Sequence, residues 1–298
     1  MEIVKELKKL NCGEVRENVS MREYTTYKVG GKALALVLPR NEKELIKLLK
    51  FLKKNNIKKK VIGNGSNLLF SEKTYEGVLI KLDKFDYMNV NRCNIVVGAG
   101  YNLIKLAMKA ARYGMTGLEF AAGIPGTIGG AVYMNAGAYK SDMGYIVREV
   151  KVLTPDFEII TMKNKDMDFH YRTSFLQKNP DYICLEATIK LAKGNKELIM
   201  EVINDRKARR LESQPLEYPS AGSVFRNPEG DYAGRLIEEI GYKGKSIGGA
   251  QVSEKHANFI INTGNATGDE VRALIEEIKD KVKEEYNIEL KCEQEFVD

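Results

Sequence analysis

The pattern of apolar and polar positions predicts helices alternating with strands in the first half of the chain. Apolar residues recur at helical spacing after Asn41, which stands before Glu44 as in a capping box, so a helix of about 13 residues is expected there. A second amphipathic helix is expected from Asn102 to Tyr113, ended by Gly114. Short apolar runs predict strands at 60–63, 77–81 and 94–98. The alternation indicates an α/β or α+β first half.

The second half predicts short strands and then helices. Strands are expected at 147–153, 157–161 and 182–191. A long helix is predicted from Asn195 to Leu211, and the composition changes after it, which places a domain boundary near Leu211. Beyond it, we expect a helix over 231–240, a strand over 258–262, and a helix opened by a capping box at Thr267 and reaching Tyr286.

Composition narrows the class of protein. The 298 residues are 43% apolar and 30% charged, which excludes a disordered chain and a polytopic membrane protein. The N-terminus lacks the apolar stretch of a secretory signal, and the four cysteines form no CxxC pair. Because the cysteines are widely spaced, we expect reduced thiols and a cytoplasmic location. Because the chain has two histidines, we expect no metal site. The net charge of +6 suits nucleic acid or small anionic ligands, but the basic stretch 53–60 lacks interleaved aromatics and favours a solvated face.

Glycine clusters follow several predicted strands, where backbone N–H groups can bind phosphate. The clusters at 98–100 and 244–246 match the known phosphate motifs poorly. The turn Gly63–Asn67 offers polar side chains beside two glycines, and a tight structural turn is an equal alternative. The segment Gly117–Ala138 is glycine-rich yet apolar, so we expect a buried loop against a flat ligand rather than a helix or strand over most of it. A crossing of small residues between packed elements is the alternative.

Motifs at 25–31, 61–69, 117–138, 171–174, 220–228 and 248–258 resemble, in order, those of the UDP-N-acetylenolpyruvoylglucosamine reductase (MurB) family in its shorter form. The resemblance runs from about Tyr24 to Glu293, nearly the whole chain. It implies an α+β protein with an FAD-binding fold of the vanillyl-alcohol-oxidase (PCMH) type and a C-terminal α+β substrate domain. The domains expected are FAD-binding subdomain 1 over 1–85, to which the C-terminal tail can return, FAD-binding subdomain 2 over 86–200, and a substrate-binding domain over 201–298.

The resemblance also implies an enzyme, a UDP-N-acetylmuramate dehydrogenase of peptidoglycan precursor synthesis. NADPH is expected to reduce FAD, and the flavin to pass hydride to C3 of the enolpyruvyl group of UDP-N-acetylglucosamine enolpyruvate. The cofactors expected are FAD and NADPH, and the partner is a small-molecule UDP-sugar. Neither nucleic acid nor membrane is an expected partner, and protein partners are left open.

Three residues match the catalytic positions of that family. Ser223 is expected to protonate C2, Arg172 to hold the substrate carboxylate as negative charge develops on it, and Glu293 to assist at the enolpyruvyl carboxyl group. The family has Glu-Val where this chain has Glu293-Gln294, and Glu295 lies on the same face of an extended strand, so both acids remain candidates. Read without the resemblance, the serine is a cap, the arginine a surface ion pair and the glutamate a solvated side chain.

Binding residues are implied in the same way. Asn227 and His256 are expected to contact the substrate, although a structural histidine is an equal alternative. FAD is expected against two turns through backbone N–H groups and close glycine approach, at Gly63, Asn64, Gly65, Ser66 and Asn67, and at Gly123, Ile124, Pro125, Gly126, Thr127, Gly129 and Gly130. The rival hypotheses are another FAD oxidoreductase of this fold acting on a hydroxy acid or sugar alcohol, and a non-catalytic protein that binds nucleotides or nucleic acid.

Overall fold

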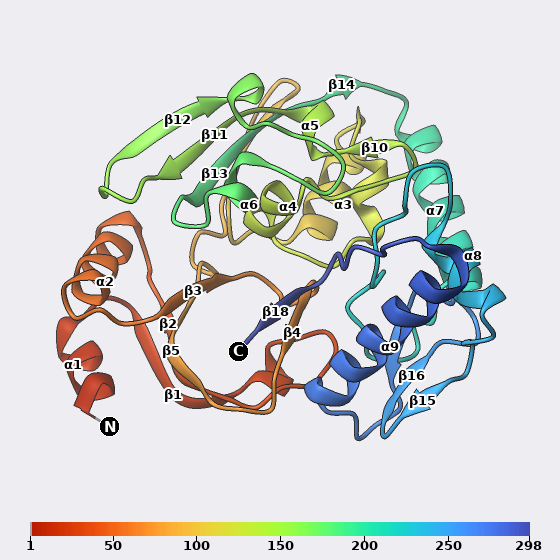
Figure 1. Ribbon diagram of the computed structural model, residues 1–298. Coiled ribbons are helices and arrows are strands. Elements are labelled where there is room, and N and C mark those ends of the chain that lie inside the picture. Colours follow the sequence, from red (N-terminus) through yellow and green to blue (C-terminus); the bar gives the residue numbers. More distant parts are fainter. Residues whose placement is uncertain (1) are drawn as a thin grey trace. The chain divides into compact units, whose positions relative to one another are not determined.

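The computed structural model describes residues 2–298 and contains both helices and sheets (Figure 1). The chain forms two compact units, each assembled from separate stretches of sequence. Unit 1 comprises the residues up to Glu17 together with Ala35–Asn64 and Gly77–Ala208. Unit 2 comprises Asn18–Leu34, Gly65–Glu76 and Arg209–Asp298. The proposed division into two flavin subdomains and one substrate domain stays a prediction.

Two sheets organise unit 1. The first has the strand order β1-β2-β5-β3, with β1 Glu14–Ser20, β2 Lys32–Leu38, β5 Tyr75–Lys81 and β3 Lys59–Ile62. Strands β1, β2 and β5 of this sheet each have some residues in the stretches of unit 2. The second is antiparallel and has the order β12-β11-β13-β7-β6, with β12 Ile159–Lys163, β11 Val147–Leu153, β13 Ile183–Lys190, β7 Asn94–Gly98 and β6 Met88–Asn91. Two-stranded pairs are formed by β9 Gly137–Ala138 with β10 Ser141–Asp142, and by β8 Met115–Thr116 with β14 Ala192–Lys193. The strands predicted from short apolar runs are confirmed, with ends displaced by one or two residues.

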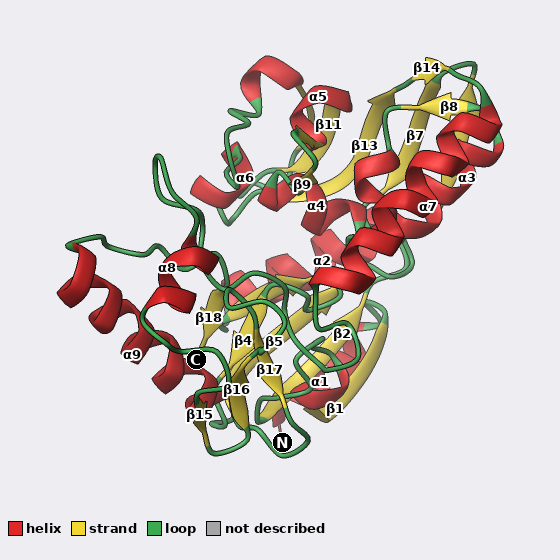
Figure 2. Cartoon of the chain, turned by 90° about the vertical axis from the view of Figure 1, so that its right-hand side faces the viewer, coloured by secondary structure: helices red, strands yellow, loops and turns green. Residues whose placement is uncertain are grey.

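The helices of unit 1 are α1 Glu2–Leu10, α2 Glu42–Lys54, α3 Leu103–Arg112, α4 Ile128–Met134, α5 Met143–Ile146, α6 Phe175–Lys178 and α7 Lys196–Ser213, the last running on into unit 2, with the 3₁₀ turns η2 Glu119–Gly123 and η3 Asn164–Asp166. Three of these helices, α2, α3 and α7, begin where the sequence predicts them to begin. Asn41 caps α2 by accepting from the Glu44 N–H at 3.0 Å. Helices α3 and α7 lie side by side in Figure 2, packed through Ala111 and Ile203.

The glycine-rich segment 117–138 departs from the expected loop over one stretch. Residues Ile128–Met134 form helix α4 rather than loop, and Asn135 ends it in the left-handed conformation with φ 44°. A glycine inside a helix costs about 1 kcal/mol relative to alanine, but a Cβ at Gly129 would stand only 3.1 Å from the Cβ of Ala99. Close packing against β7 and the turn after it therefore offsets the poor helix propensity. The predicted burial is confirmed for the helix, where Ile128 and Val132 are fully buried, but not for Pro125, which is exposed.

Unit 2 is a helix packed on a small sheet (Figure 1). Its elements are η1 Met21–Glu23, β4 Leu68–Phe70, α8 Ala233–Glu239, β15 Ser246–Ile247, β16 Ala250–Val252, β17 Ile260–Asn262, α9 Gly268–Tyr286 and β18 Glu295–Val297. Strands β15, β16 and β17 form an antiparallel sheet, and β18 pairs in parallel with β4. The capping box predicted at Thr267 is present at the start of α9. The core joins C-terminal residues to Tyr27, Val29 and Leu69, so distant segments share one cluster.

Candidate functional site

The arginine expected to hold a carboxylate lies in unit 1, at a corner of a tight turn. His170 and Thr173 pair across this turn through two backbone hydrogen bonds of 3.0 Å, which leaves Tyr171 and Arg172 at its corners. Arg172 has φ 53°, a left-handed conformation that non-glycine residues seldom adopt. Its guanidinium donates to the Gly137 carbonyl at 2.8 Å and lies over the Tyr171 ring. The half-buried side chain is therefore held by its neighbours.

Two buried polar side chains fasten this turn to the end of helix α4. Asn135 is 1% exposed, donates to the His170 carbonyl at 2.8 Å and accepts from the Gly144 N–H at 2.9 Å. Ser174 is fully buried and donates to the Tyr133 carbonyl at 2.7 Å. A buried polar group left without its partner costs about 1–3 kcal/mol. These contacts therefore keep the turn, and Arg172 with it, in one place.

Two glycines of unit 1 that were predicted to contact FAD, Gly63 and Gly129, leave room for neighbouring residues of the same unit. A Cβ on Gly63 would meet the Thr127 hydroxyl oxygen at 2.7 Å. The Gly129 N–H donates to the Ala99 carbonyl at 2.8 Å, and the Gly130 N–H donates to the Thr127 hydroxyl at 3.3 Å. The N–H groups of Gly129 and Gly130, at the start of α4, are thus bonded within unit 1. At Gly130, in contrast, an added Cβ would meet only the Thr127 hydroxyl, at an ordinary contact distance of 3.5 Å.

The residues just before α4 form a half-exposed connection. Gly123 ends the turn η2, and the Ile124 N–H donates to a carbonyl within that turn. Pro125 is exposed, and the Gly126 carbonyl accepts from the Leu103 N–H at 3.0 Å, at the start of α3. The connection is therefore tied to α3 while one of its residues faces solvent.

Unit 2 pairs the Ser223 segment with the Glu293 segment. The Glu293 N–H donates to the Val224 carbonyl at 2.7 Å, and Phe225 and Cys292 form an antiparallel bridge. The serine and the glutamate predicted from the sequence are therefore held on adjoining extended segments. Both side chains are partly exposed, and the Ser223 hydroxyl makes no hydrogen bond to another residue of 2–298.

A side chain absent from the predicted site holds the residues that follow the serine. Asn258, 4% exposed, accepts from the Phe225 N–H at 2.9 Å and donates to the Phe225 carbonyl at 2.8 Å. The Asn258 carbonyl also accepts from the Val224 N–H at 2.9 Å. Asn258 ends the motif 248–258, so the sequence did contain a signal for it. Its contact with Phe225 joins residues that are far apart in the sequence, so the sequence alone does not show it.

A second amide that sequence reasoning missed holds the residues before the serine. Gln294 is 4% exposed, and its Nε2 donates to the carbonyls of Ala221 at 3.3 Å and Gly222 at 3.5 Å. Its Oε1 accepts from the Tyr27 hydroxyl at 3.1 Å. Tyr27 is fully buried, and this desolvation raises the pKa of its phenol, which stays a neutral donor.

The part of the first predicted flavin turn that lies in unit 2 supports the C-terminal segment. The Asn67 amide donates to the Glu293 carbonyl at 3.0 Å, and the Asn67 carbonyl accepts from the Glu295 N–H at 2.9 Å. Gly65 has φ 65°, and a Cβ there would meet the Tyr24 carbonyl oxygen at 2.1 Å, so the position requires glycine. Asn67 therefore helps to place the glutamate, a role that the sequence did not indicate.

Several polar groups in these turns fit a bound polar cofactor. In unit 1, the half-buried side chain of Asn64 has no hydrogen-bond partner among the described residues. In unit 2, the same holds for the half-buried Ser66 side chain, and the Thr26 hydroxyl is buried without a partner in residues 2–298. Buried polar atoms are nearly always hydrogen-bonded. The buried Thr26 hydroxyl can therefore find its partner in a ligand such as FAD, and the side chains of Asn64 and Ser66 are also available to donate to one.

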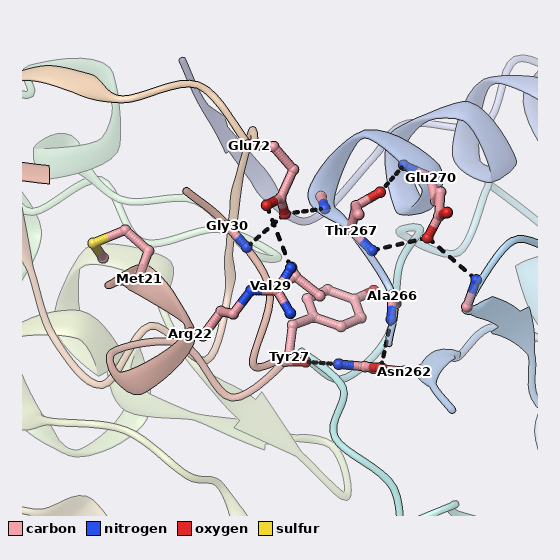
Figure 3. Close-up of polar contacts among 12 residues, drawn as sticks. Met21, Arg22, Tyr27, Val29, Gly30, Glu72, Asn262, Ala266, Thr267 and Glu270 are labelled. Atoms are coloured by element: carbon pink, nitrogen blue, oxygen red, sulfur yellow. Dashed lines mark hydrogen bonds and ion pairs between the residues drawn. The ribbon is translucent and has the colours of Figure 1, made fainter. Parts of the chain in front are cut away.

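The motif at 25–31 is fastened to the start of helix α9 (Figure 3). One carboxylate oxygen of Glu72 accepts from the Gly30 N–H at 3.1 Å and from the Gly268 N–H, the first of α9, at 2.9 Å. Asn262 donates to the Tyr27 carbonyl at 3.0 Å. An acid at a helix N-terminus is favoured by the helix dipole. The loop that carries Tyr27 is thus fixed by two independent contacts.

The two predicted substrate contacts differ in their surroundings. His256 is half-buried, and desolvation lowers the pKa of its imidazole, which is therefore neutral near pH 7. Its Nδ1 accepts from the Asn258 N–H at 3.2 Å, which leaves Nε2 as the protonated, donating nitrogen. Asn227 is exposed, and its Oδ1 accepts from the Ala233 N–H at 3.2 Å, at the start of α8.

The predicted catalytic residues are divided between the two units. Unit 1 holds Arg172, and unit 2 holds Ser223 and Glu293 on paired segments. The predicted FAD contacts are divided as well, since Asn64 belongs to unit 1 and Gly65 to unit 2. Among the helices of residues 2–298, none combines the length and apolar character needed to cross a membrane.

Comparisons with known proteins agree with these observations. A family model described as "FAD binding domain" matches residues 33–163, and one described as "UDP-N-acetylenolpyruvoylglucosamine reductase, C-terminal domain" matches 214–297. The chain is 48% identical to the UDP-N-acetylenolpyruvoylglucosamine reductase of Halalkalibacterium halodurans, over 99% of this chain and 98% of that one. It is 43% identical to the reductase of Bacillus subtilis, over 99% and 98% of the respective chains.

A solved structure extends the comparison to the fold. The crystal structure of the reductase MurB from Thermus caldophilus is 35% identical, superposes with a TM-score of 0.82, and is matched over 96% of this chain and 100% of that one. The predicted fold class is confirmed: an FAD-binding fold of the vanillyl-alcohol-oxidase type, mixed in helix and strand, followed by a distinct C-terminal family domain.

Proposed function

Because this chain belongs to the UDP-N-acetylenolpyruvoylglucosamine reductase family of oxidoreductases, we propose that it uses NADPH to reduce UDP-N-acetylglucosamine enolpyruvate to UDP-N-acetylmuramate. The FAD-binding domain makes it a flavoprotein. The observation that carries the proposal is the pairing of the Ser223 segment with the Glu293 segment in unit 2. A flavoenzyme that oxidises a hydroxy acid has no need of a proton donor beside an acid.

The chemistry that a bound FAD would supply is hydride transfer from NADPH to C3 of the enolpyruvyl group. Asn64 and Ser66 offer unpaired side-chain donors for holding the cofactor, and Gly130 leaves room for a flat ring to approach the backbone. The Thr26 hydroxyl is a further donor, buried and without a protein partner in residues 2–298. The protein's own contribution is then to orient the substrate, stabilise developing charge and deliver the proton.

Ser223 is the proposed proton donor to C2. A serine hydroxyl is a weak acid in water, but the carbanion that forms at C2 is a strong base, and fixed proximity contributes much of the rate. The Ser223 hydroxyl has no protein partner in residues 2–298 and can turn toward a substrate. Glu293 is proposed to assist at the enolpyruvyl carboxyl group from the adjoining segment.

Arg172 is the proposed partner of the substrate carboxylate. Its guanidinium is always charged and planar, which suits a carboxylate into which negative charge spreads. The Gly137 carbonyl and the Tyr171 ring hold the group before substrate arrives, which limits the entropy lost on binding.

The uridine diphosphate part of the substrate presents oxygens that accept hydrogen bonds from donating side chains. His256 is proposed to donate from Nε2 to a diphosphate or uracil oxygen, because its Nδ1 is already occupied by the Asn258 N–H. Asn227 caps α8 through Oδ1, and its amide nitrogen is proposed to contact the same ligand.

An anaerobic titration tests the proposed function. The purified protein should be yellow, should bleach with NADPH, and should recover its oxidised spectrum when UDP-N-acetylglucosamine enolpyruvate is added. In Ser223→Ala, flavin reduction should persist, while reoxidation by substrate should slow by about 10²–10⁴-fold. Ser246→Ala removes an exposed hydroxyl elsewhere in unit 2 and serves as the control. Failure of this substrate to reoxidise the wild-type flavin would remove the proposed activity, and reduction of the flavin by a hydroxy acid would favour an oxidase instead.

A further inference from the structure

Two buried amides lie on either side of Ser223 in unit 2. Asn258 holds the backbone after it, at Val224 and Phe225, and Gln294 holds the backbone before it, at Ala221 and Gly222. Because the serine hydroxyl itself makes no hydrogen bond to a described residue, its position depends on these backbone contacts.

The contact made by Gln294 falls where the chain has the greatest freedom. Gly222 has φ 73°, and no atom lies within 4 Å of the place where its Cβ would be. Packing therefore does not restrain this residue, and a glycine has more conformations available than any other residue. The Gln294 amide, which donates to the carbonyls of Ala221 and Gly222, supplies the restraint that packing lacks.

Gln294 also lies next to the proposed acid. The Glu293 N–H donates to Val224, and the Glu293 carbonyl accepts from Asn67. The side chain that reaches the residues before Ser223 therefore belongs to the same segment that carries Glu293. The Tyr27 hydroxyl completes the arrangement, because it fixes Oε1 of Gln294 and so decides which end of the amide faces Ala221.

An apolar side chain could occupy the core position of Gln294 without the free-energy cost of removing an amide from water. A buried amide loses its hydration and is stable only when its hydrogen bonds are made. This chain nevertheless places a glutamine here, and its side-chain oxygen and nitrogen are both hydrogen-bonded. Packing alone does not account for that choice.

We propose that Gln294, oriented by Tyr27, is a positioning residue that fixes the Ser223 hydroxyl relative to Glu293 for proton transfer to the substrate. The proposal rests on the proposed function for its chemistry and on unit 2 alone for its geometry. It predicts that the proton-transfer step is slowed when the amide is lost, even when the core remains well packed.

Three variants separate positioning from stability. Gln294→Met keeps the length of the side chain and removes the amide, which leaves the Tyr27 hydroxyl buried without a partner; Tyr27→Phe makes the converse change. Each should lower the melting temperature by a few degrees, because a buried polar group loses its partner. The double variant no longer contains the unpaired Tyr27 hydroxyl and should recover the part of the loss that this hydroxyl causes, while the Ala221 and Gly222 carbonyls still lack the Gln294 donor.

The activity of the double variant decides whether Gln294 positions Ser223 or only stabilises the fold. Its flavin should be reduced by NADPH at the wild-type rate, but reoxidation by substrate should stay about 10-fold or more below wild type, because small misplacements of reacting groups cost large factors in rate. The solvent deuterium isotope effect on reoxidation should rise, since the proton step becomes slower. The KM for the UDP-sugar should change less than kcat. Recovery of both melting temperature and reoxidation rate in the double variant overturns the proposal.

Hydrogen exchange gives a readout that does not depend on activity. In the holoenzyme, peptides covering 221–226 should exchange faster in Gln294→Met and in the double variant than in the wild type, while peptides covering α3 should not change. Unchanged exchange at 221–226 also overturns the proposal. If the wild-type flavin is not reoxidised by this substrate, the proposed function fails, and the exchange data still decide whether Gln294 holds the serine segment.

Discussion

At the scale of single residues, the chemistry of unit 2 depends on the protonation states of His256 and Tyr27. His256 is neutral because burial disfavours its charged form, and the positive charge of Lys243 acts in the same direction, while Glu238 opposes it. Tyr27 keeps its proton for the same reason, which allows it to donate to Gln294. The sequence supplied these residue types, but the direction of each pKa shift came from burial.

The stability of the protein should therefore fall on mild acidification. In the unfolded chain a histidine protonates near pH 6.5, whereas folded His256 protonates at a lower pH, so the unfolded state binds more protons in between. The free energy of unfolding should decrease as the pH falls below about 6.5, by at most about 1.4 kcal/mol per pH unit from this group. Urea denaturation at several pH values between 5 and 7.5 measures the slope.

The variant His256→Gln isolates that contribution. It lacks the titrating group, so its slope between pH 6.5 and 5 should be smaller than that of the wild type. The carboxyl groups with lowered pKa, such as Glu270, lose their stabilising effect only below about pH 4.5, outside this window. Equal slopes in the two proteins would show that folded His256 titrates as it does in the unfolded chain.

At the scale of elements, the ends of helices were predicted well and the glycine-rich helix was not. The caps at Asn41, Asn102 and Thr267 are local, because each side chain bonds a backbone N–H three residues on. Helix α4 contradicts its own propensities, since Gly129 packs closely against Ala99, a neighbour from another part of the chain. Local signals failed where a tertiary contact overrode them.

The capping box of α9 offers a direct measure of a local signal. The Thr267 hydroxyl accepts from the Glu270 N–H at 3.2 Å, and the Glu270 carboxylate accepts from the Thr267 N–H at 2.9 Å. Thr267→Ala should lower the free energy of unfolding by about 0.5–2 kcal/mol, whereas Thr267→Ser keeps the hydroxyl and should cost little. Thermal or urea unfolding checks both variants, and equal losses in the two would contradict the cap as the cause.

At the scale of the whole molecule, each unit is completed by segments that are distant in the sequence. Strand β18 pairs with β4, and Tyr27, Val29 and Leu69 belong to the same core cluster as α9 (Figure 1). The C-terminal family match begins at residue 214, yet unit 2 also needs 18–34 and 65–76. The residues matched by the C-terminal family model therefore do not by themselves make up unit 2.

A fragment comprising residues 209–298 tests this dependence. It lacks the three buried side chains that the earlier segments contribute and the β4 partner of β18. We expect no cooperative thermal transition in the isolated fragment by circular dichroism, while the full chain shows one. A sharp, reversible transition in the fragment would mean that the C-terminal segment folds alone.

The sequence by itself determined the family, the FAD-binding fold, the helices and strands with clear periodicity, and the identity of Ser223, Glu293 and Arg172 as candidates, because these depend on residue type, spacing and local caps. Only the tertiary structure decided which groups hold them. Asn258, Gln294 and Asn67 act through hydrogen bonds to residues distant in the chain, and no periodicity records such a contact. It also decided that part of a glycine-rich segment becomes a helix, since the space available at Gly129 is set by Ala99, in the turn after β7.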